Sequence, residues 1–257
     1  MPSRKKKAAA TSGSNLKTFY WILAVVGLAG VVGIAWVTMG GPGQAAQQPI
    51  EIPDTAYANA QELVKAAQGI KIGSDNAPIK MLVFSDFQCP ACAIYGTQVE
   101  PNLKRDWIEP GKVQLTYYDF PLTQIHRWAF LAARAGRCAN EQGKFWPFHD
   151  IMLSRQRSWS FATTAPIKDF EAFATEVGAD AREFRNCVNS DKYADVVSVN
   201  QRLGSQLRVS GTPSLYMNGR MLGKEWGDYA LLKARIEQEI GPAAGNPPAP
   251  APTTTTQ

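Results

Sequence analysis

Two cysteines separated by two residues, Cys89 and Cys92, stand where an apolar strand-like run meets a helical pattern. This spacing places both thiols in the first turn of the predicted helix, close enough to join as a small disulfide. The unpaired N–H groups and the positive end of the helix dipole favour a thiolate at Cys89. Pro90 fits the first helical turn, because a residue there needs no N–H partner. A stabilised thiolate both attacks disulfides and leaves from them, so the sequence predicts a thiol–disulfide redox pair.

The same spacing also occurs in zinc sites and in structural bridges. A zinc site needs a second pair of ligands at a matching short spacing. The remaining histidines and cysteines form no such pair: His126, His149, Cys138 and Cys187. A purely structural bridge between Cys89 and Cys92 would close so short a loop that it would add little stability. We therefore predict neither a metal nor an organic cofactor at this pair.

The basic residues of the chain are unevenly placed. The net charge is +5 at pH 7, and one group of cations lies near the N-terminus without an acid among them: Arg4, Lys5, Lys6, Lys7 and Lys17. We interpret this excess as a signal of membrane topology and not as a footprint for nucleic acid. Residues 1–18 are accordingly predicted to be a basic cytoplasmic tail.

Residues 19–39 form an uncharged apolar run. As a helix this run would span about 30 Å, the thickness of a hydrocarbon core. The basic flank predicts that the N-terminus stays in the cytoplasm and the rest of the chain lies outside. A cleavable signal peptide is the alternative; its apolar core would be shorter, about 7–15 residues, although small residues near 44–46 leave cleavage open. We predict an uncleaved, single-pass transmembrane anchor.

Beyond the apolar run the chain divides into three parts. Residues 40–69 are predicted to be a linker with a short amphipathic helix, residues 70–240 a folded domain, and the Pro-, Ala- and Thr-rich residues 241–257 a disordered tail. Apolar alternation predicts strands at 70–72, 79–87, 113–119, 213–217 and 220–222. Helical periodicity predicts helices from Cys92 to about Trp107 and at 126–141, 144–154, 167–177, 180–189, 191–207 and 228–240. The helical block over about 124–208 must therefore be inserted between two halves of one α/β unit.

Four motifs follow one another in the folded domain: 85–92 around the cysteines, 119–122 followed by His126, 137–146, and 211–214. In their order and spacing these motifs resemble the DsbA-like thioredoxin-fold thiol–disulfide oxidoreductases, in particular the membrane-anchored members. The resemblance covers residues 70–240. It implies an α/β, thioredoxin-like fold with a helical insertion, and protein-disulfide oxidoreductase activity.

The resemblance assigns the catalytic pair and its neighbours by position: Cys89, Cys92, Pro90 and Ala91. Cys89 matches the more exposed nucleophile, and Cys92 matches the buried resolving cysteine. Pro213 matches the cis-proline that faces the pair, and a cis X–Pro bond costs only about 0.5–1 kcal/mol relative to trans. Thr212 would then offer its backbone to an extended substrate. Spacing alone does not separate this role from that of a trans proline that opens a strand.

Two positions depart from the family pattern. Many members carry an acid six residues before the first cysteine, where it helps to move protons to and from the buried thiol; here that position is Val83. Asp86 is nearer the motif, but we expect it to point elsewhere. The strongest oxidants carry a histidine between the cysteines, whereas Ala91 offers neither charge nor hydrogen bond. We therefore predict a Cys89 pKa that is less depressed, and a pair that is less oxidising, than in those members.

The second pair of cysteines, Cys138 and Cys187, falls in the helical block among apolar neighbours, where free buried cysteines also occur. Related proteins often bridge the corresponding positions, so the resemblance implies a structural disulfide, which an oxidising compartment permits. Closing a loop of about 50 residues would stabilise the fold by about 4 kcal/mol in the chain-entropy model. Neither histidine is expected to be catalytic: His126 is interpreted as a structural or groove residue, and His149 as a residue packed within an aromatic helical segment.

The sequence and the resemblance together predict a membrane-tethered, extracytoplasmic thiol–disulfide oxidoreductase that forms disulfides in exported proteins, on the periplasmic or outer face of the cell membrane. Its partners would be client proteins with cysteine thiols and a membrane redox partner that reoxidises the pair, and no nucleic acid. A dimerisation domain is not visible, which favours a monomer. Two alternatives remain open. A reductase or isomerase of the same fold would run the thiol–disulfide exchange in the opposite direction, and a metal-binding or chaperone module would not catalyse this exchange.

Overall fold

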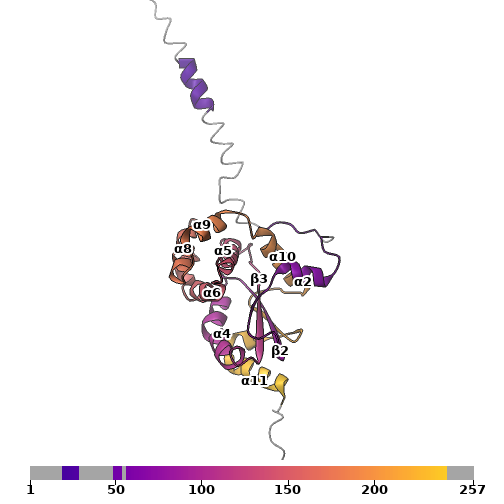
Figure 1. Ribbon diagram of the computed structural model, residues 1–257. Helices are drawn as coiled ribbons and strands as arrows, with labels where there is room; N and C mark the ends of the chain where they lie inside the picture. Colours follow the sequence, from indigo (N-terminus) through magenta and orange to yellow (C-terminus); the bar gives the residue numbers. More distant parts are fainter. Residues whose placement is uncertain (1–18, 29–48, 54–55, 242–257) are drawn as a thin grey trace, which may run out of the picture. The chain divides into compact units, whose positions relative to one another are not determined.

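The computed structural model of the chain describes residues 19–28, 49–53 and 56–241 (Figure 1). Residues 1–45 and 46–257 form two separate units. In the first unit residues 19–28 are helical, while the rest of the predicted membrane span and the predicted basic tail lie outside the described residues. Within the described ranges, none of the helices combines the length and the apolar character that a bilayer crossing requires. The first part of the predicted linker and most of the predicted C-terminal tail also lie outside the description.

Residues 56–241 contain a five-stranded mixed sheet in the order β1-β3-β2-β4-β5. The strands are β1 (Ile70–Ile72), β2 (Ile79–Ser85), β3 (Val113–Asp119), β4 (Ser214–Met217) and β5 (Arg220–Met221). β2 runs parallel to β3, with Ile79 opposite Val113, and antiparallel to β4, with Val83 opposite Leu215. The nearly continuous apolar run of β2 fits a strand that is covered on both faces. The predicted central strand is therefore confirmed, and it ends at Ser85, just before the cysteine motif.

The helices are α2 (Ala60–Ala67), α3 (Pro90–Ile94), α4 (Glu100–Leu103), α5 (Ala129–Glu141), α6 (Phe145–Ser154), α7 (Gln156–Trp159), α8 (Ile167–Glu176), α9 (Ala181–Asn189), α10 (Ala194–Gln206) and α11 (Tyr229–Ile240), with a 3₁₀ turn at η4 (Lys224–Gly227). Helices α5 to α10 are inserted between β3 and β4, as the sequence predicted. In Figure 1, α5, α6, α8 and α9 form one group, and α10 lies beside α2.

The helix that follows Cys92 is less regular than predicted. Two π-helical turns, η2 (Tyr95–Val99) and η3 (Lys104–Ile108), interrupt the α-helical hydrogen bonding. In the first of them the N–H of Glu100 bonds the carbonyl of Tyr95, five residues earlier. A π turn fits an extra residue into the helix. Tyr95 and Glu100 therefore both face the core on the same side as Cys92, and all three are buried.

Each face of the sheet carries its own hydrophobic core. On one face, apolar residues of β2 and β3 pack against the helices that follow the cysteines and against the insertion; Tyr117 stands at its centre, 5.0 Å from the Phe145 ring. On the other face, Phe84 stacks on Tyr118 at 5.1 Å beneath α2 and α10. Burial on both faces fixes the end of β2 from which the cysteine motif departs.

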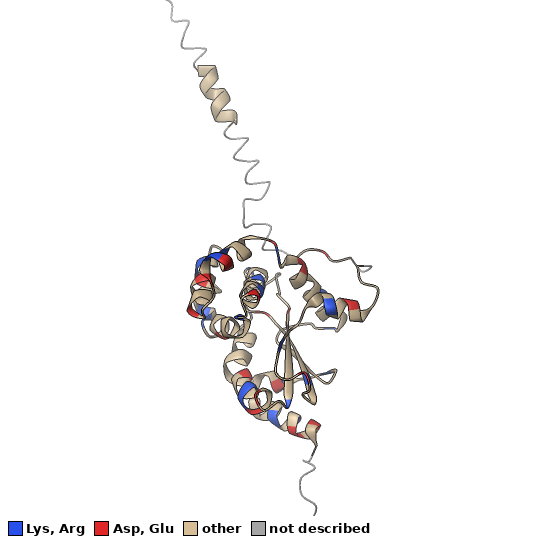
Figure 2. Ribbon diagram, viewed as in Figure 1, with Lys and Arg blue, Asp and Glu red and all other residues tan. Residues whose placement is uncertain are grey.

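One ion pair is buried where the insertion meets the sheet. Acidic and basic residues are otherwise interspersed along the helices (Figure 2). Arg137 of α5 donates to the carboxylate of Asp119 at 2.6 Å and to the side-chain oxygen of Asn200 at 2.9 Å. It also donates to the carbonyl of Gln68 at 2.5 Å. These bonds oppose the desolvation of the two charges, although burial still raises the pKa of Asp119. They also tie α5, β3, α10 and the end of α2 together.

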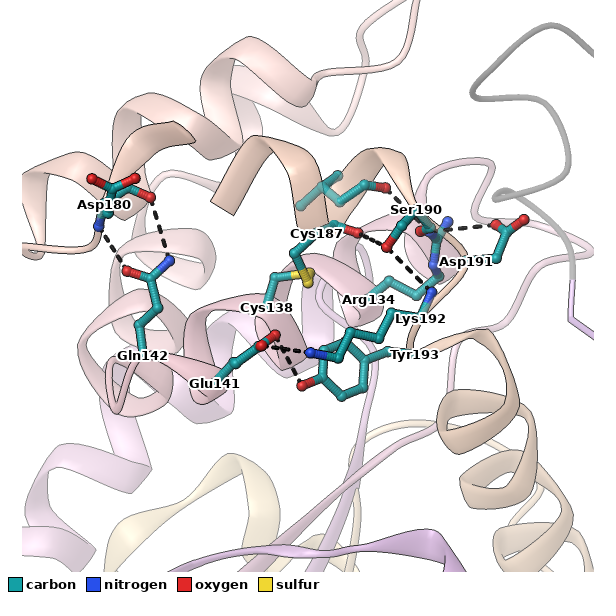
Figure 3. Close-up of a disulfide and its surroundings, with 11 residues drawn as sticks. Arg134, Cys138, Glu141, Gln142, Asp180, Cys187, Ser190, Asp191, Lys192 and Tyr193 are labelled. Carbon is teal, nitrogen blue, oxygen red and sulfur yellow. Dashed lines mark hydrogen bonds and ion pairs between the residues drawn. A yellow bond between two sulfur atoms is a disulfide. The ribbon is translucent and has the colours of Figure 1, made fainter. Parts of the chain in front are cut away.

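A disulfide between Cys138 and Cys187 joins α5 to α9, across a sequence separation of 49 residues (Figure 3). Around it Glu141 accepts from Lys192 at 2.5 Å and from the Tyr193 hydroxyl at 3.2 Å. The C-terminal end of α5 is therefore held both by the disulfide and by polar contacts with the segment that leads into α10.

Candidate active site

The cysteine pair sits at the carboxyl end of the central strand. A tight turn follows β2, in which the N–H of Cys89 bonds the carbonyl of Asp86 at 3.0 Å. Cys89 is the N-cap of α3 and has an extended backbone, and Pro90 occupies the first helical position. Cys92 lies one turn into α3 and is fully buried, whereas 7% of Cys89 is exposed. The local sequence thus presents one sulfur at the surface and keeps the other beneath it.

Thr212 and Pro213 come to the same place from the far end of the chain. The peptide bond between them is cis. The Cys89 thiol lies 3.3 Å from the carbonyl oxygen of Thr212, a contact that spans 123 residues of sequence. The structure therefore brings together the six residues that the resemblance assigned to the site: Cys89, Pro90, Ala91, Cys92, Thr212 and Pro213. Cys138 and Cys187 lie in the insertion as a disulfide.

The two free thiols of the pair are electrostatically unequal. Hydrogen bonding from the Cys92 thiol is the largest effect that lowers the pKa of Cys89, to about 5. The Thr212 side chain and the backbone N–H groups of Cys92 and Ala91 lower this pKa further, and burial opposes them. Burial raises the pKa of Cys92 well above its ordinary value, and its interaction with Cys89 adds to the rise. At neutral pH the reduced site is thus a Cys89 thiolate above a neutral Cys92 thiol.

The backbone of Asp86 touches the cysteine pair, while its carboxylate bonds other residues, in line with the expectation that the side chain points elsewhere. Its backbone N–H lies 3.4 Å from the Cys92 sulfur. Its buried carboxylate accepts hydrogen bonds from the N–H groups of Gln88 and Leu122, at 2.8 and 2.9 Å, and bonds Nδ1 of His126 at 2.6 Å. The hydrogen bond with Asp86 raises the pKa of His126. Sequence spacing gives no signal for the contact between Asp86 and His126, because the two residues are 40 positions apart.

Two glutamines brace the turn that carries Cys89. Gln156 of α7 donates to the carbonyls of Phe87 and Cys89, at 2.7 and 2.8 Å. Gln88 donates to the carbonyl of Ser160 at 2.6 Å and accepts from the N–H of Trp128 at 2.6 Å. The insertion therefore fixes the backbone of the active-site turn, a role that the sequence did not reveal.

One group of carboxylate and imidazole side chains among the described residues has the spacing of a metal site: Glu100, His149 and Asp150. The ammonium of Lys104 lies 2.9 Å from Glu100 and 2.8 Å from Asp150. A cation that bridges both carboxylates is thus already part of the protein. The group better fits a buried ion-pair network than a metal centre.

Comparison with known proteins agrees with this geometry. The chain matches the protein-family model described as thioredoxin over residues 65–237. It is 32% identical over 182 residues to a probable disulfide bond formation protein D of Bacillus cereus, covering 66% of this chain and 77% of that protein. Among solved structures, it resembles α-DsbA1 of Wolbachia pipientis with a TM-score of 0.60 and 20% identity, over 66% of this chain and 90% of that one. It resembles oxidised DsbA of Mycobacterium tuberculosis with a TM-score of 0.56 and 22% identity, over 68% and 94% of the two chains. The chain therefore belongs to the DsbA-like thioredoxin-fold family of protein-disulfide oxidoreductases.

Proposed function

We propose that this oxidoreductase works as a thiol oxidase that forms disulfides in exported proteins. The observation that carries the proposal is the start of α3, where the Cys92 thiol, the Thr212 side chain and two backbone N–H groups all stabilise a thiolate at Cys89. Stabilising this thiolate stabilises the reduced pair, and a pair with a stable reduced form oxidises other thiols. A pKa of about 5 lies between the values of about 3.5 for DsbA and about 7 for thioredoxin.

The reaction begins with the oxidised pair. A client thiolate attacks the Cys89 sulfur, a mixed disulfide forms, and Cys92 leaves and takes up a proton because its own pKa is high. A second client thiolate then attacks the client sulfur, and Cys89 leaves as a stable thiolate. The client loses two electrons and two protons; the cysteine pair gains both electrons and one proton, and the second proton goes to solvent. An extended client can pair with the backbone at Thr212 while its cysteine reaches Cys89.

A purified, oxidised full-length protein should restore activity to reduced, unfolded ribonuclease, and thiol alkylation of growing cells should trap the Cys89–Cys92 pair oxidised. A Cys89→Ser variant should lose this activity and keep its fold. A pair that is trapped reduced in cells, in a protein that reduces insulin and does not reactivate ribonuclease, would assign the reductase or isomerase direction instead. Mixed disulfides trapped with a Cys92→Ala variant would identify the clients and the membrane redox partner.

The proposed location is the outer side of the cell membrane, with residues 19–39 as a single-pass anchor and the protein as a monomer. Three features support it: the basic residues before the apolar run, the exposed large apolar side chains of the helix at 19–28, and the disulfide in the insertion, which an oxidising compartment favours. Full-length protein should stay with membranes after alkaline carbonate extraction, and a chain that starts at Ala46 should be released. Mature protein that begins near Ala46 in the soluble fraction would replace the anchor with a cleaved signal.

A further inference from the structure

A cavity of about 490 Å³ opens beside the active-site turn. Gln88 and Pro90, the two neighbours of Cys89 in sequence, form one of its walls. The opposite wall consists of the segment before α5 and of α7 with the residues that follow it. A larger cavity of about 1280 Å³ borders α8 and α9, but no residue of the active-site turn lines it. The smaller cavity is therefore the one that a polypeptide reacting at Cys89 would meet.

The charge of the smaller cavity has one sign. Among the described residues that line it, three are basic, His126, Arg127 and Arg157, and none is acidic. Both arginines are exposed, and neither forms an ion pair with a described carboxylate. The guanidinium of Arg127 rests 4.5 Å from the ring centre of Trp128, which restricts its position. The hydrogen bond that Asp86 accepts raises the pKa of His126, and the same carboxylate balances the charge of the protonated imidazole, so the two arginines supply the excess positive charge.

The rim of the same cavity is apolar. Ile125 is 74% exposed and Phe161 is 82% exposed, and both line the cavity. A single exposed apolar side chain is common on protein surfaces. Two large ones on the rim of one cavity, together with two arginines that pair with no described carboxylate, match a ligand that carries both carboxylates and apolar side chains.

We propose that this cavity receives an acidic client segment with an apolar side chain while the client's neighbouring cysteine reacts at Cys89. This inference rests on the proposed function. A client strand paired at Thr212 rises about 3.3 Å per residue, so side chains one to three residues from its cysteine can cross Pro90 and reach Arg127 and Arg157. The rate at which a client cysteine reacts would thus depend on the residues that flank it.

The test compares two reduced dithiol peptides that differ only at two positions near the reacting cysteine. One peptide carries Asp and Glu there and its twin carries Asn and Gln, and both have the same leucine beside these positions. With oxidised full-length protein at low salt, the acidic peptide should be oxidised about five times faster than its twin, a ratio in the range expected for two partly solvated ion pairs. The ratio should fall toward one in an Arg127→Gln/Arg157→Gln double variant, and also at high ionic strength. Oxidation of dithiothreitol, an uncharged dithiol, should be unchanged.

An Arg182→Gln/Arg220→Gln variant is the matched control, because it loses the same two charges at exposed positions on α9 and β5. An acidic preference that survives the cavity substitutions, or that the control reduces equally, would overturn the inference. Serine versions of both peptides measure binding without any redox step. Should the protein oxidise neither peptide but bind the acidic serine version selectively, the oxidase proposal would fail and the cavity assignment would stand.

Discussion

Replacing Cys92 should raise the pKa of Cys89, because the Cys92 thiol is the largest of the groups that lower it. A hydrogen bond to a charged group contributes about 1.5–3 kcal/mol, and one pKa unit corresponds to about 1.4 kcal/mol. Cys92→Ala removes the donor, so the Cys89 pKa should rise by about 1–2 units from its value of about 5. Backbone N–H groups and Thr212 remain, and they should keep it below the value of a free cysteine. Cys92→Ser keeps an O–H donor of similar size, and its Cys89 pKa should stay near that of the wild type.

The measurement is the rate of Cys89 alkylation as a function of pH, with the ultraviolet absorbance of the thiolate as a second readout. Both variants suit it, because the chain has four cysteines and two of them are joined as Cys138–Cys187, so Cys89 is the remaining thiol. The reasoning would be refuted if the alanine and serine variants titrated at the same pH. In that case the helix start and Thr212 alone would account for the acidity of Cys89.

Three further outcomes concern stability. The pKa of Cys89 is lower in the folded than in the unfolded chain, so the contribution of this thiolate to the free energy of unfolding is fully present above about pH 8.5 and is lost as the pH falls through about 5. In urea unfolding, the free energy of unfolding of the reduced wild type should rise by about 1–2 kcal/mol more than that of Cys89→Ser between about pH 5 and about pH 7, after allowance for solvent screening. Equal pH profiles of the two proteins would contradict this. Replacing Cys138 and Cys187 together by alanine should lower the free energy of unfolding by about 4 kcal/mol in denaturant titrations, and a loss below about 1 kcal/mol would mean that the reduced chain is already restrained. Gly204→Ala places a methyl group 2.5 Å from a ring atom of Phe120. This overlap should lower the free energy of unfolding by about 1–3 kcal/mol, against a gain of about 1 kcal/mol in helix propensity. Gly227→Ala is the control, because its added methyl group meets nothing within 4 Å.

Local patterns were sufficient for most secondary structure. β1 and β3 have the predicted bounds, because alternation and turn residues act within the strand itself. The final helix begins after Asp228, whose side chain accepts from the N–H groups of Ala230 and Leu231, and it ends before Gly241. The helix predicted at 126–141 begins only at Ala129, since residues before it are used in bonds to the active-site turn.

What the sequence did not reveal depends on contacts between distant segments. The hydrogen bond between His126 and the Asp86 carboxylate forms only when the loop after β3 folds back over the cysteine motif. The buried position of Glu100 depends on a π turn, for which no sequence rule was available. Arg137 belongs to the third family motif, but its partners lie far from it in sequence: Asp119 at the end of β3 and Asn200 in α10.

The link between α5 and α9 has a consequence for proteolysis. The segment between α7 and α8 exposes Phe161, Thr163 and Thr164, and it lies within the ring that Cys138–Cys187 closes. A protease that nicks the chain there leaves one fragment with Cys89 and another with Thr212, and the bridge keeps the two in one covalent molecule. In denaturing gel electrophoresis such a nicked protein would migrate as one band without reductant and as two bands with it. The two halves of the active site, the Cys89 sulfur and the Thr212 carbonyl, would stay covalently linked until the bridge was reduced.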